Sequence, residues 1–225
     1  MIEFIDVSMR YDTGYVALEN VNLKIEDGEF VFIVGHSGAG KTTLTKLLMC
    51  EERITGGSLI IDGYSLRTIK DSEVSMLRRR LGIVFQDFRL FENKTVYENI
   101  AFPMRVTGTS PRVIKKRVNA FLNLVELADK KDSFPYELSG GQQQRVAFAR
   151  AIANIPNIVI ADEPTGNVDR RLSLQLFQLL EDINKQGKTV IVVTHDMELV
   201  RQYNKRVITI EGGHIAGDTK GGMTL

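Results

Sequence analysis

The sequence predicts an α/β protein with a mainly parallel sheet core that is interrupted by a helical insertion. Three observations support this fold class. Short apolar runs of strand length occur in the first and last thirds of the chain, amphipathic helical segments alternate with them in the last third, and the middle has a helical pattern. Apolar strands that alternate with amphipathic helices are typical of a parallel sheet covered on both faces.

Strand-like runs separated by Gly, Asp and Asn turn signals fill most of the first third. The predicted strands here are Ile2–Val7, Val21–Ile25, Glu29–Val34 and Ser58–Ile61, and a further strand covers Leu81–Phe85. One predicted helix, Lys41–Cys50, interrupts them. This helix directly follows a glycine-rich loop, which is important for the function.

The middle of the chain, from about Asp87 to Ala153, reads mostly as helix because apolar residues recur there at helical spacing. In the last third we expect strands Ile158–Ala161, Thr189–Val193 and Arg206–Ile210, and helices Arg171–Gln186 and Met197–Tyr203. We therefore expect a single domain, with a core made of residues 1–86 and 157–225 and a helical subdomain made of residues 87–156.

Composition limits the class of protein. The 225 residues are 43% hydrophobic and 25% charged, as in ordinary globular proteins. A net charge of +1 provides no reason to expect nucleic-acid binding. We expect no signal peptide and no membrane span, because the apolar runs are far shorter than the roughly 20 residues that a spanning helix needs. The single cysteine, Cys50, cannot form an internal disulfide, and we expect it to be buried.

A glycine-rich loop between a predicted strand and a predicted helix fits the pattern G-x-x-x-x-G-K-[ST]. It consists of Gly35, His36, Ser37, Gly38, Ala39, Gly40, Lys41 and Thr42, with Thr43 next in the helix. Backbone N–H groups of such a loop surround phosphate oxygens, the lysine bridges the β- and γ-phosphates, and the hydroxyl of Thr42 binds Mg²⁺. The alternative is a glycine-rich turn without a ligand, but the strand-loop-helix context favours ATP.

Two acidic residues, Asp162 and Glu163, follow the apolar run Ile158–Ala161. A buried strand delivers such residues to the carboxyl edge of the sheet, where ligands of α/β folds bind. Asp162 is expected to hold Mg²⁺, and Glu163 is expected to polarise the attacking water. A solvated acidic turn before Pro164 is the alternative. A phosphotransferase has little need of a base at this position, so hydrolysis is favoured.

The run Leu138-Ser139-Gly140-Gly141-Gln142 resembles the LSGGQ signature of the ABC (ATP-binding cassette) ATPases. A serine and two glycines that open a helix form a second anion site of hydroxyl and N–H donors. The resemblance covers essentially the whole chain, from Met1 to about Gly217, and implies a P-loop NTPase of ABC type, with an antiparallel β subdomain and a helical signature subdomain. It also implies a homodimer on ATP binding, in which each signature closes over the nucleotide of the other copy.

Other residues match the family by their order along the chain. Gln86 resembles the family's glutamine that senses Mg²⁺ or water, and Asn167-Val168-Asp169 resembles its D-loop, with Asp169 near the nucleotide. His195 resembles the histidine that contacts the γ-phosphate, although a lone histidine is often structural. Tyr11 lies where the family stacks an aromatic ring on adenine, but tyrosines are common in such turns.

Within the family the chain is most similar to the ATPases of bacterial cell division. That resemblance implies an integral membrane subunit as partner, an indirect link to peptidoglycan hydrolases outside the membrane, and a place on the cytoplasmic face of the membrane at the division site. An exporter ATPase shares most of these motifs and is the alternative. An ABC protein of translation or DNA repair is a different class, but it usually has two cassettes or a long coiled-coil insertion.

Two features are open to more than one interpretation. The apolar residues Phe88, Leu90 and Phe91 either pack in the core or form a groove for a helix of a membrane subunit. The basic runs Arg78–Arg80 and Lys115–Arg117 are expected to lie on solvated helix faces, with lipid headgroups as the alternative contact.

Overall fold

The computed structural model describes residues 1–166 and 168–219. They form two compact units. The first unit combines Met1–Arg78 with the chain from Ile183 onward, and the second is Arg79–Asp182. The expected division into a core and a helical subdomain at residues 86 and 157 stays a prediction.

An antiparallel sheet in the first unit is the expected β subdomain. Its strand order is β2-β1-β4-β5. The strands are β1 (Ile2–Arg10), β2 (Val16–Ile25), β4 (Gly56–Ile61) and β5 (Tyr64–Ser65). Register shifts interrupt the pairing of β1 with β2, and Ile2, Phe4 and Val7 of β1 are buried. This sheet therefore has an apolar face, as the sequence pattern of its strands predicts.

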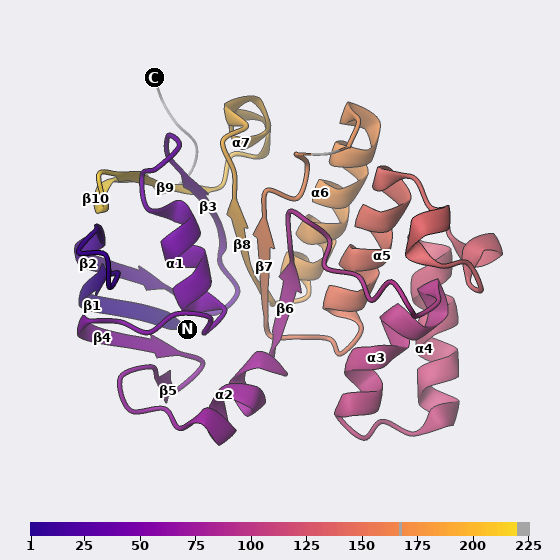
Figure 1. Ribbon diagram of the computed structural model, residues 1–225. Helices are drawn as coiled ribbons and strands as arrows, with labels where there is room; N and C mark the ends of the chain where they lie inside the picture. The colour runs from indigo at the N-terminus through magenta and orange to yellow at the C-terminus, as the bar shows by residue number, and fades with distance from the viewer. Residues whose placement is uncertain (167, 220–225) are drawn as a thin grey trace. The chain divides into compact units, whose positions relative to one another are not determined.

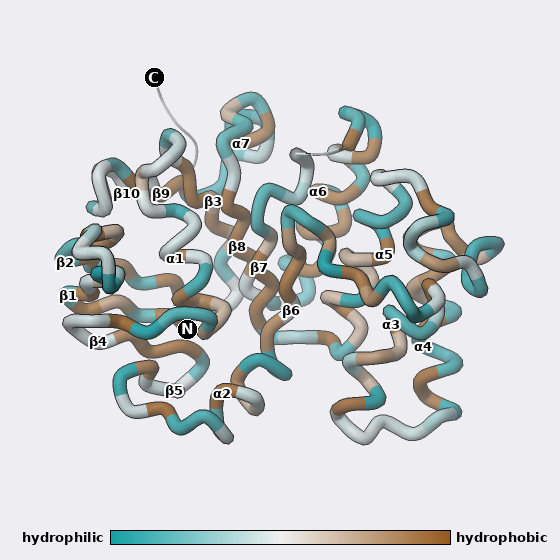
Figure 2. The backbone as a smooth tube through the Cα atoms, viewed as in Figure 1, coloured by the Kyte–Doolittle hydropathy of each residue, from teal (hydrophilic) through white to brown (hydrophobic). Residues whose placement is uncertain are grey.

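Strand β3 (Phe30–Val34) runs parallel to both of its neighbours in the first unit, β8 (Thr189–Val193) and β9 (Arg206–Glu211). Every residue of β3 and β8 is buried, and Figure 2 shows both strands as hydrophobic. Strand β10 (His214–Thr219) pairs antiparallel with β9. Completely buried strands indicate a sheet covered on both faces, which confirms the predicted parallel core.

Helices α1 (Lys41–Leu48), α2 (Asp71–Arg78) and α7 (Met197–Tyr203) belong to the first unit. Helix α1 ends two residues before Cys50, which has a left-handed φ of 57° and is half-buried. Burial raises the pKa of the Cys50 thiol. Arg78 is not simply solvated, because its guanidinium donates hydrogen bonds to the carbonyls of Met49 and Cys50.

The second unit combines a parallel strand pair with helices. Strands β6 (Leu81–Val84) and β7 (Ile158–Asp162) pair from Leu81↔Ile158 to Val84↔Ala161. The helices are α3 (Val96–Val106), α4 (Pro111–Leu124), α5 (Gly140–Ile152) and most of α6 (Arg170–Lys185), with 3₁₀ turns η1 (Ala128–Lys130) and η2 (Pro135–Glu137). Helix α3 contacts α4 and α5, and α5 contacts β6 (Figure 1).

The prediction that the chain is mostly helical from residue 87 is wrong for its first nine residues. Residues 87–95 form turns and irregular backbone, and α3 begins only at Val96, where Thr95 provides an N-cap. The sequence analysis also did not identify α2 or β10. No helix in residues 1–166 and 168–219 combines the length and the apolar character that crossing a bilayer requires.

Candidate nucleotide-binding site

The phosphate loop lies between β3 and α1, as predicted. Gly40 caps α1 with a φ of 110°, and no side chain accepts a hydrogen bond at this helix start. A Cβ atom at Gly40 would lie 2.7 Å from the carbonyl oxygen of Ala17. Glycine is therefore required here, and the first N–H groups of α1 lack a side-chain cap, which is the arrangement of an anion site.

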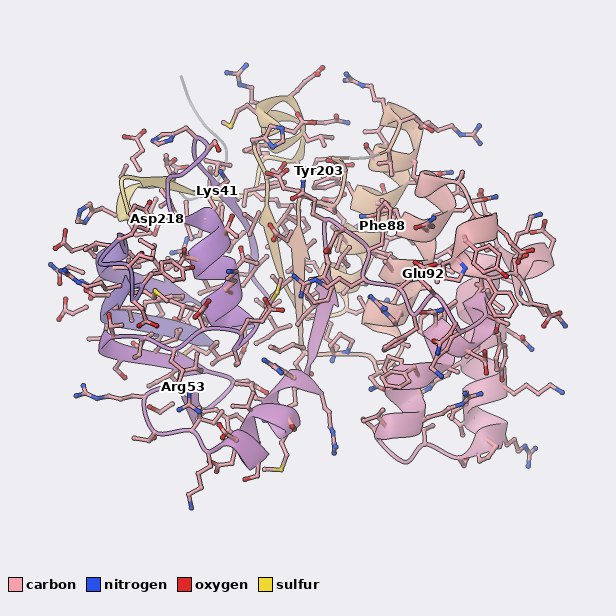
Figure 3. All side chains as sticks on the ribbon, viewed as in Figure 1. Lys41, Arg53, Phe88, Glu92, Tyr203 and Asp218 are labelled. Carbon is pink, nitrogen blue, oxygen red and sulfur yellow. The ribbon has the colours of Figure 1, made fainter. Side chains whose placement is uncertain are left out.

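The ammonium of Lys41 lies inside its own loop. Its Nζ donates hydrogen bonds to the carbonyl oxygens of Gly35 at 2.7 Å and His36 at 3.0 Å. Figure 3 labels Lys41 at the start of α1. A cation held by carbonyls at a helix N-terminus is available to pair with phosphate oxygens. The imidazole Nδ1 of His36 lies 2.7 Å from the carbonyl oxygen of Ser37, so His36 is tied to the loop.

Two tyrosines flank the phosphate loop. The hydroxyl of Tyr11 lies 3.1 Å from Oγ1 of Thr43, which is buried, whereas the neighbouring Thr42 is exposed. The rings of Tyr11 and Tyr15 stack with centroids 6.4 Å apart, and Tyr15 is 56% exposed. The sequence analysis did not identify Tyr15, although a second aromatic residue in the turn after Tyr11 was a visible signal. An exposed ring beside a phosphate loop provides a surface on which a base can stack.

His195 lies at the same edge of the sheet as the phosphate loop. It follows β8, which pairs in parallel with β3 from Phe30↔Val190 to Ile33↔Val193. Parallel neighbours end at the same edge, so the carboxyl end of β8 brings His195 to the side where β3 enters the loop. His195 is exposed, and Thr194 before it is completely buried.

In the second unit, Gln86 and the acidic pair follow neighbouring parallel strands. Gln86 comes two residues after β6, and Asp162 and Glu163 stand at the end of β7. Glu163 has a left-handed φ of 44°, which is unusual for a residue other than glycine. Backbone strain of this kind is often found at functional sites. A Cβ atom at Gly166 would lie 3.9 Å from the amide nitrogen of Gln86, so the loops after the two strands approach each other.

The signature residues begin α5 with a complete capping box. The hydroxyl of Ser139 accepts a hydrogen bond from the N–H of Gln142, and the Gln142 side chain accepts one from the N–H of Ser139 at 2.9 Å. Ser139 and Gly140 are exposed, and Gly141 and Gln142 are half-buried. The predicted hydroxyl and N–H donors therefore stand at an accessible helix N-terminus.

Two side chains that the sequence analysis did not identify connect α5 to the loops after β6 and β7. Gln144 is 1% exposed, and its amide donates a hydrogen bond of 2.6 Å to the carbonyl of Pro164. Arg150 donates hydrogen bonds to the carbonyls of Phe88 at 2.8 Å and Arg89 at 2.6 Å. Both residues lie in the run that follows the signature motif, but no local pattern indicates which backbone atoms they contact.

Asp169 caps α6. Its carboxylate accepts a hydrogen bond from the N–H of Leu172 at 2.9 Å, and its carbonyl accepts one from the hydroxyl of Ser173 at 3.0 Å. These contacts provide a local role for Asp169. The expected place of Asp169 near a nucleotide stays a prediction, and Asn167 of the expected D-loop lies outside the described residues.

The site residues thus form two sets, one in each unit. The first unit holds Tyr11, the phosphate loop and His195, and the second holds Gln86, Asp162, Glu163, the signature and Asp169. No cluster of three or more His, Cys, Asp or Glu suited to a metal occurs in the residues that the structure describes. Mg²⁺ beside a nucleotide does not require such a cluster, because this ion is commonly held by one or two carboxylates together with substrate phosphates.

Comparison with known proteins identifies the class. Residues 18–166 match the family model described as ABC transporter. Two solved structures of the ATP-binding cassette MJ0796, one a dimer "bound to ADP and Pi", superpose with a TM-score of 0.91 each; they share 38% and 39% identity and cover 98% of both chains. The chain therefore belongs to the ABC transporter family, and its fold is that of the ABC-type P-loop NTPases.

Curated relatives match over nearly the full length. The "Cell division ATP-binding protein FtsE" of Bacillus subtilis is 49% identical, covering 99% of this chain and 97% of the relative. The protein of the same name from Streptococcus pneumoniae is 50% identical, covering 99% and 96%. That of Escherichia coli K12 is 44% identical, covering 96% and 98%. This chain is thus similar to the FtsE proteins from one end to the other.

Proposed function

We propose that this chain is the ATP-hydrolysing subunit of a bacterial cell-division complex of FtsE–FtsX type. The observation that supports the proposal most strongly is the near full-length identity of 44–50% to proteins named FtsE. The chain is an ATPase of ABC type, since it has this family's fold and a strand-ending acid pair as well as a phosphate loop. The names of these relatives favour cell division over the exporter alternative.

Each unit contributes a separate part of the chemistry. Lys41 and the N–H groups at the start of α1 would bind the phosphates, and Tyr11 would stack on the adenine. Glu163 would accept a proton from the attacking water, and His195 would contact the γ-phosphate. Thr42, Asp162 and Gln86 provide oxygen atoms of the type that Mg²⁺ takes beside a nucleotide, and the bound ion would neutralise phosphate charge.

The role of Glu163 is tested by Glu163→Gln. The amide cannot accept the proton of water, so we expect the hydrolysis rate to fall by about 100-fold or more while ATP affinity stays within about twofold. Steady-state phosphate release and fluorescent-nucleotide titration measure the two quantities. Lys41→Ala is the matched variant, because it should weaken ATP binding itself. Full turnover by Glu163→Gln would remove Glu163 from the role of base.

The solved relatives support a dimer, because both are described as dimeric. We propose that two copies of this chain join head-to-tail on ATP binding and that the Ser139 turn of each completes the nucleotide site of the other. In a Glu163→Gln background, ATP should convert the chain from monomer to dimer in light scattering. Adding Ser139→Arg should block dimer formation but spare ATP binding, because a long cation replaces a hydroxyl donor. Normal dimers in the Ser139→Arg variant would reject this arrangement.

The membrane partner is the part of the proposal that reaches beyond the chain itself. An FtsX-type integral subunit would hold the chain at the cytoplasmic face of the membrane at the division site, as a peripheral protein. Closing and opening of the ATPase dimer would then be transmitted to peptidoglycan hydrolases outside the membrane. Copurification from detergent should recover such a subunit, and depletion of the chain should produce division defects that the Glu163→Gln variant does not rescue. Recovery of a subunit with a solute pathway would favour an exporter instead.

A further inference from the structure

The segment between β6 and α3 contains two consecutive left-handed residues, neither of which is glycine. Phe88 has a φ of 58° and Arg89 a φ of 46°. Side chains with a Cβ atom disfavour this conformation, and two in succession are rarer still. Two backbone hydrogen bonds, to the carbonyls of Phe85 and Asp87, tighten the turn from within, and the Arg89 guanidinium donates to the Asp87 carboxylate and lies over the Phe85 ring. The surrounding structure must therefore hold this conformation in place.

Arg150 supplies that support from α5. Its two terminal nitrogens donate to the two carbonyls of the left-handed pair, at 2.8 Å to Phe88 and 2.6 Å to Arg89. Its guanidinium also lies 5.9 Å from the centre of the Phe91 ring, which packs on Phe102 of α3. Figure 3 labels Phe88 in this segment. One rigid, planar group thus binds the carbonyls of both left-handed residues, a fork-like contact for which the single ammonium of a lysine is not shaped.

The environment of Arg150 shows that its charge is used to bind the backbone. Burial lowers the pKa of its guanidinium to about 10, yet the group stays charged at neutral pH. Among residues 1–166 and 168–219 no carboxylate pairs with Arg150, and its guanidinium donates hydrogen bonds to carbonyl oxygens. Charge-assisted hydrogen bonds to carbonyls are stronger than neutral ones, so they offset part of the desolvation.

Gln86 lies at the beginning of this segment, directly before Asp87. The strained turn therefore sets the direction in which the chain leaves β6, and with it the placement of Gln86. We propose that Arg150 is a positioning residue, which holds the turn at Phe88 and Arg89 so that Gln86 stays in place for ATP hydrolysis. This inference rests on the proposed role of Gln86. In this proposal, α5, which begins at the signature, fixes the conformation of the segment after β6 through hydrogen bonds from Arg150.

Trypsin provides a direct test of the hold itself. The carbonyl of Arg89 belongs to the Arg89–Leu90 bond, and Arg150 covers this carbonyl with a hydrogen bond. In Arg150→Lys, cleavage after Arg89 should become about 5-fold or more faster, because local opening no longer breaks two hydrogen bonds. Arg145→Lys is the matched control, since Arg145 of the same helix donates to the carbonyl of Val125 instead. If cleavage after Arg89 is unchanged in Arg150→Lys, Arg150 does not hold the turn at Phe88 and Arg89.

Kinetics test whether the hold acts through Gln86. Arg150→Lys should lower kcat about 5- to 10-fold with KM within about twofold, because misplacement affects the reaction more than nucleotide binding. The double variant with Gln86→Ala should be no slower than Gln86→Ala alone, whereas independent effects would multiply. If the losses of kcat in the two single variants multiply in the double variant, the proposal is overturned. If Gln86→Ala turns over like the wild type, the action through Gln86 is rejected, whereas the ATPase assignment stands on Glu163→Gln.

A rescue variant separates positioning from general damage to the fold. Glycine adopts the left-handed conformation without strain. Adding Phe88→Gly to Arg150→Lys should therefore recover about half or more of the lost kcat, since the turn then needs less support. A merely unstable Arg150→Lys protein would gain nothing, because Phe88→Gly also removes a half-buried ring. Failure of the rescue, together with a general increase of tryptic cleavage along the chain, would count against positioning.

Discussion

The two units of this protein hold left-handed backbone in different ways. In the first unit the described residues with positive φ are glycines together with Asp6, Asn20, Cys50, Asp62 and Asn204. In the second unit they are Gly108 together with Phe88, Arg89, Glu126, Ile155 and Glu163. Glycine, Asn and Asp, which make up the first set apart from Cys50, tolerate this conformation through their own local chemistry, whereas Phe, Arg, Ile and Glu do not. Cys50 is the exception in the first unit, and there Arg78 donates a hydrogen bond to its carbonyl.

The comparison suggests that the phosphate loop and the loops after β6 and β7 are built on different principles. The phosphate loop takes its shape largely from its own glycines and from Lys41, which donates hydrogen bonds to carbonyls of the same loop. From outside, the N–H of Gly213 donates a hydrogen bond to the carbonyl of Ala39. The loops after β6 and β7 depend on partners from other elements, such as Arg150 and Gln144 of α5. Strain supported from outside can be released when the support moves, which suits loops that take part in a working cycle.

The largest effect is expected from Gly40→Ala in the phosphate loop. The added Cβ would meet the carbonyl of Ala17 at 2.7 Å while φ is 110°, so we expect a loss of roughly 3 kcal/mol in the free energy of unfolding and loss of ATP binding. Gly38→Ala is the matched control, because nothing lies within 4 Å of its Cβ position, and it should lose only about 1 kcal/mol. Equal losses, measured by urea unfolding, would contradict this account.

A smaller effect of opposite sign is expected in the second unit. Ile155 is β-branched and has a φ of 53°, so its backbone is strained. Its side chain is 51% exposed, so burial of apolar surface offsets little of this strain. Ile155→Asn should therefore raise the free energy of unfolding by about 0.5–1 kcal/mol, since Asn tolerates the left-handed conformation. Ile155→Val stays β-branched and should show no gain. A destabilised Ile155→Asn would mean that surrounding contacts hold Ile155 firmly.

The smallest effect concerns α3 and α5 of the second unit, which both begin with a capping box. Thr95 and Glu98 cap α3, and Ser139 and Gln142 cap α5, with an acid in one box and an amide in the other. The hydrogen bond from the Thr95 backbone lowers the pKa of Glu98 below its ordinary value. The stabilisation by Glu98 is therefore present above the unfolded-state pKa and is lost as the pH falls through the folded-state pKa.

Glu98→Gln tests this difference, because it gives α3 the neutral box that α5 already has. At pH 6 the free energy of unfolding of the wild type should be about a few tenths of a kcal/mol higher than that of Glu98→Gln, and this difference should vanish toward pH 3. Urea unfolding at both pH values measures it. If this difference in the free energy of unfolding stays constant or grows on acidification, the charge of Glu98 does not stabilise the cap.

Much of the candidate site could be read from the sequence because each motif combines a local pattern with a strand end. The phosphate loop lies where its pattern predicts, and the acidic pair Asp162 and Glu163 ends a buried strand. His195 follows β8 as expected. Apolar strands are recognisable from composition alone, and the residue after a buried strand must emerge at the sheet edge.

Other features could not be read because their partners are distant in the sequence. Arg150 contacts carbonyls more than 60 residues earlier, and Gln144 contacts Pro164 twenty residues later. Residues 87–95 are irregular instead of helical, and Asn99 and Arg150, which lie outside this segment, donate hydrogen bonds to its backbone carbonyls. Tyr15 is visible in the sequence as a second aromatic residue after Tyr11, but the exposure that makes its ring available is known only from the structure.

The sequence by itself determined most of the strands, the phosphate loop, the signature and the choice of hydrolysis, because each of these depends on short-range geometry that a local pattern specifies. Only the tertiary structure decided which backbone carbonyls α5 holds, where the non-glycine left-handed turns lie, and which tyrosine stays exposed. The physical reason is that these features are stabilised by hydrogen bonds and packing between elements, and the energy of such contacts depends on the fold being formed.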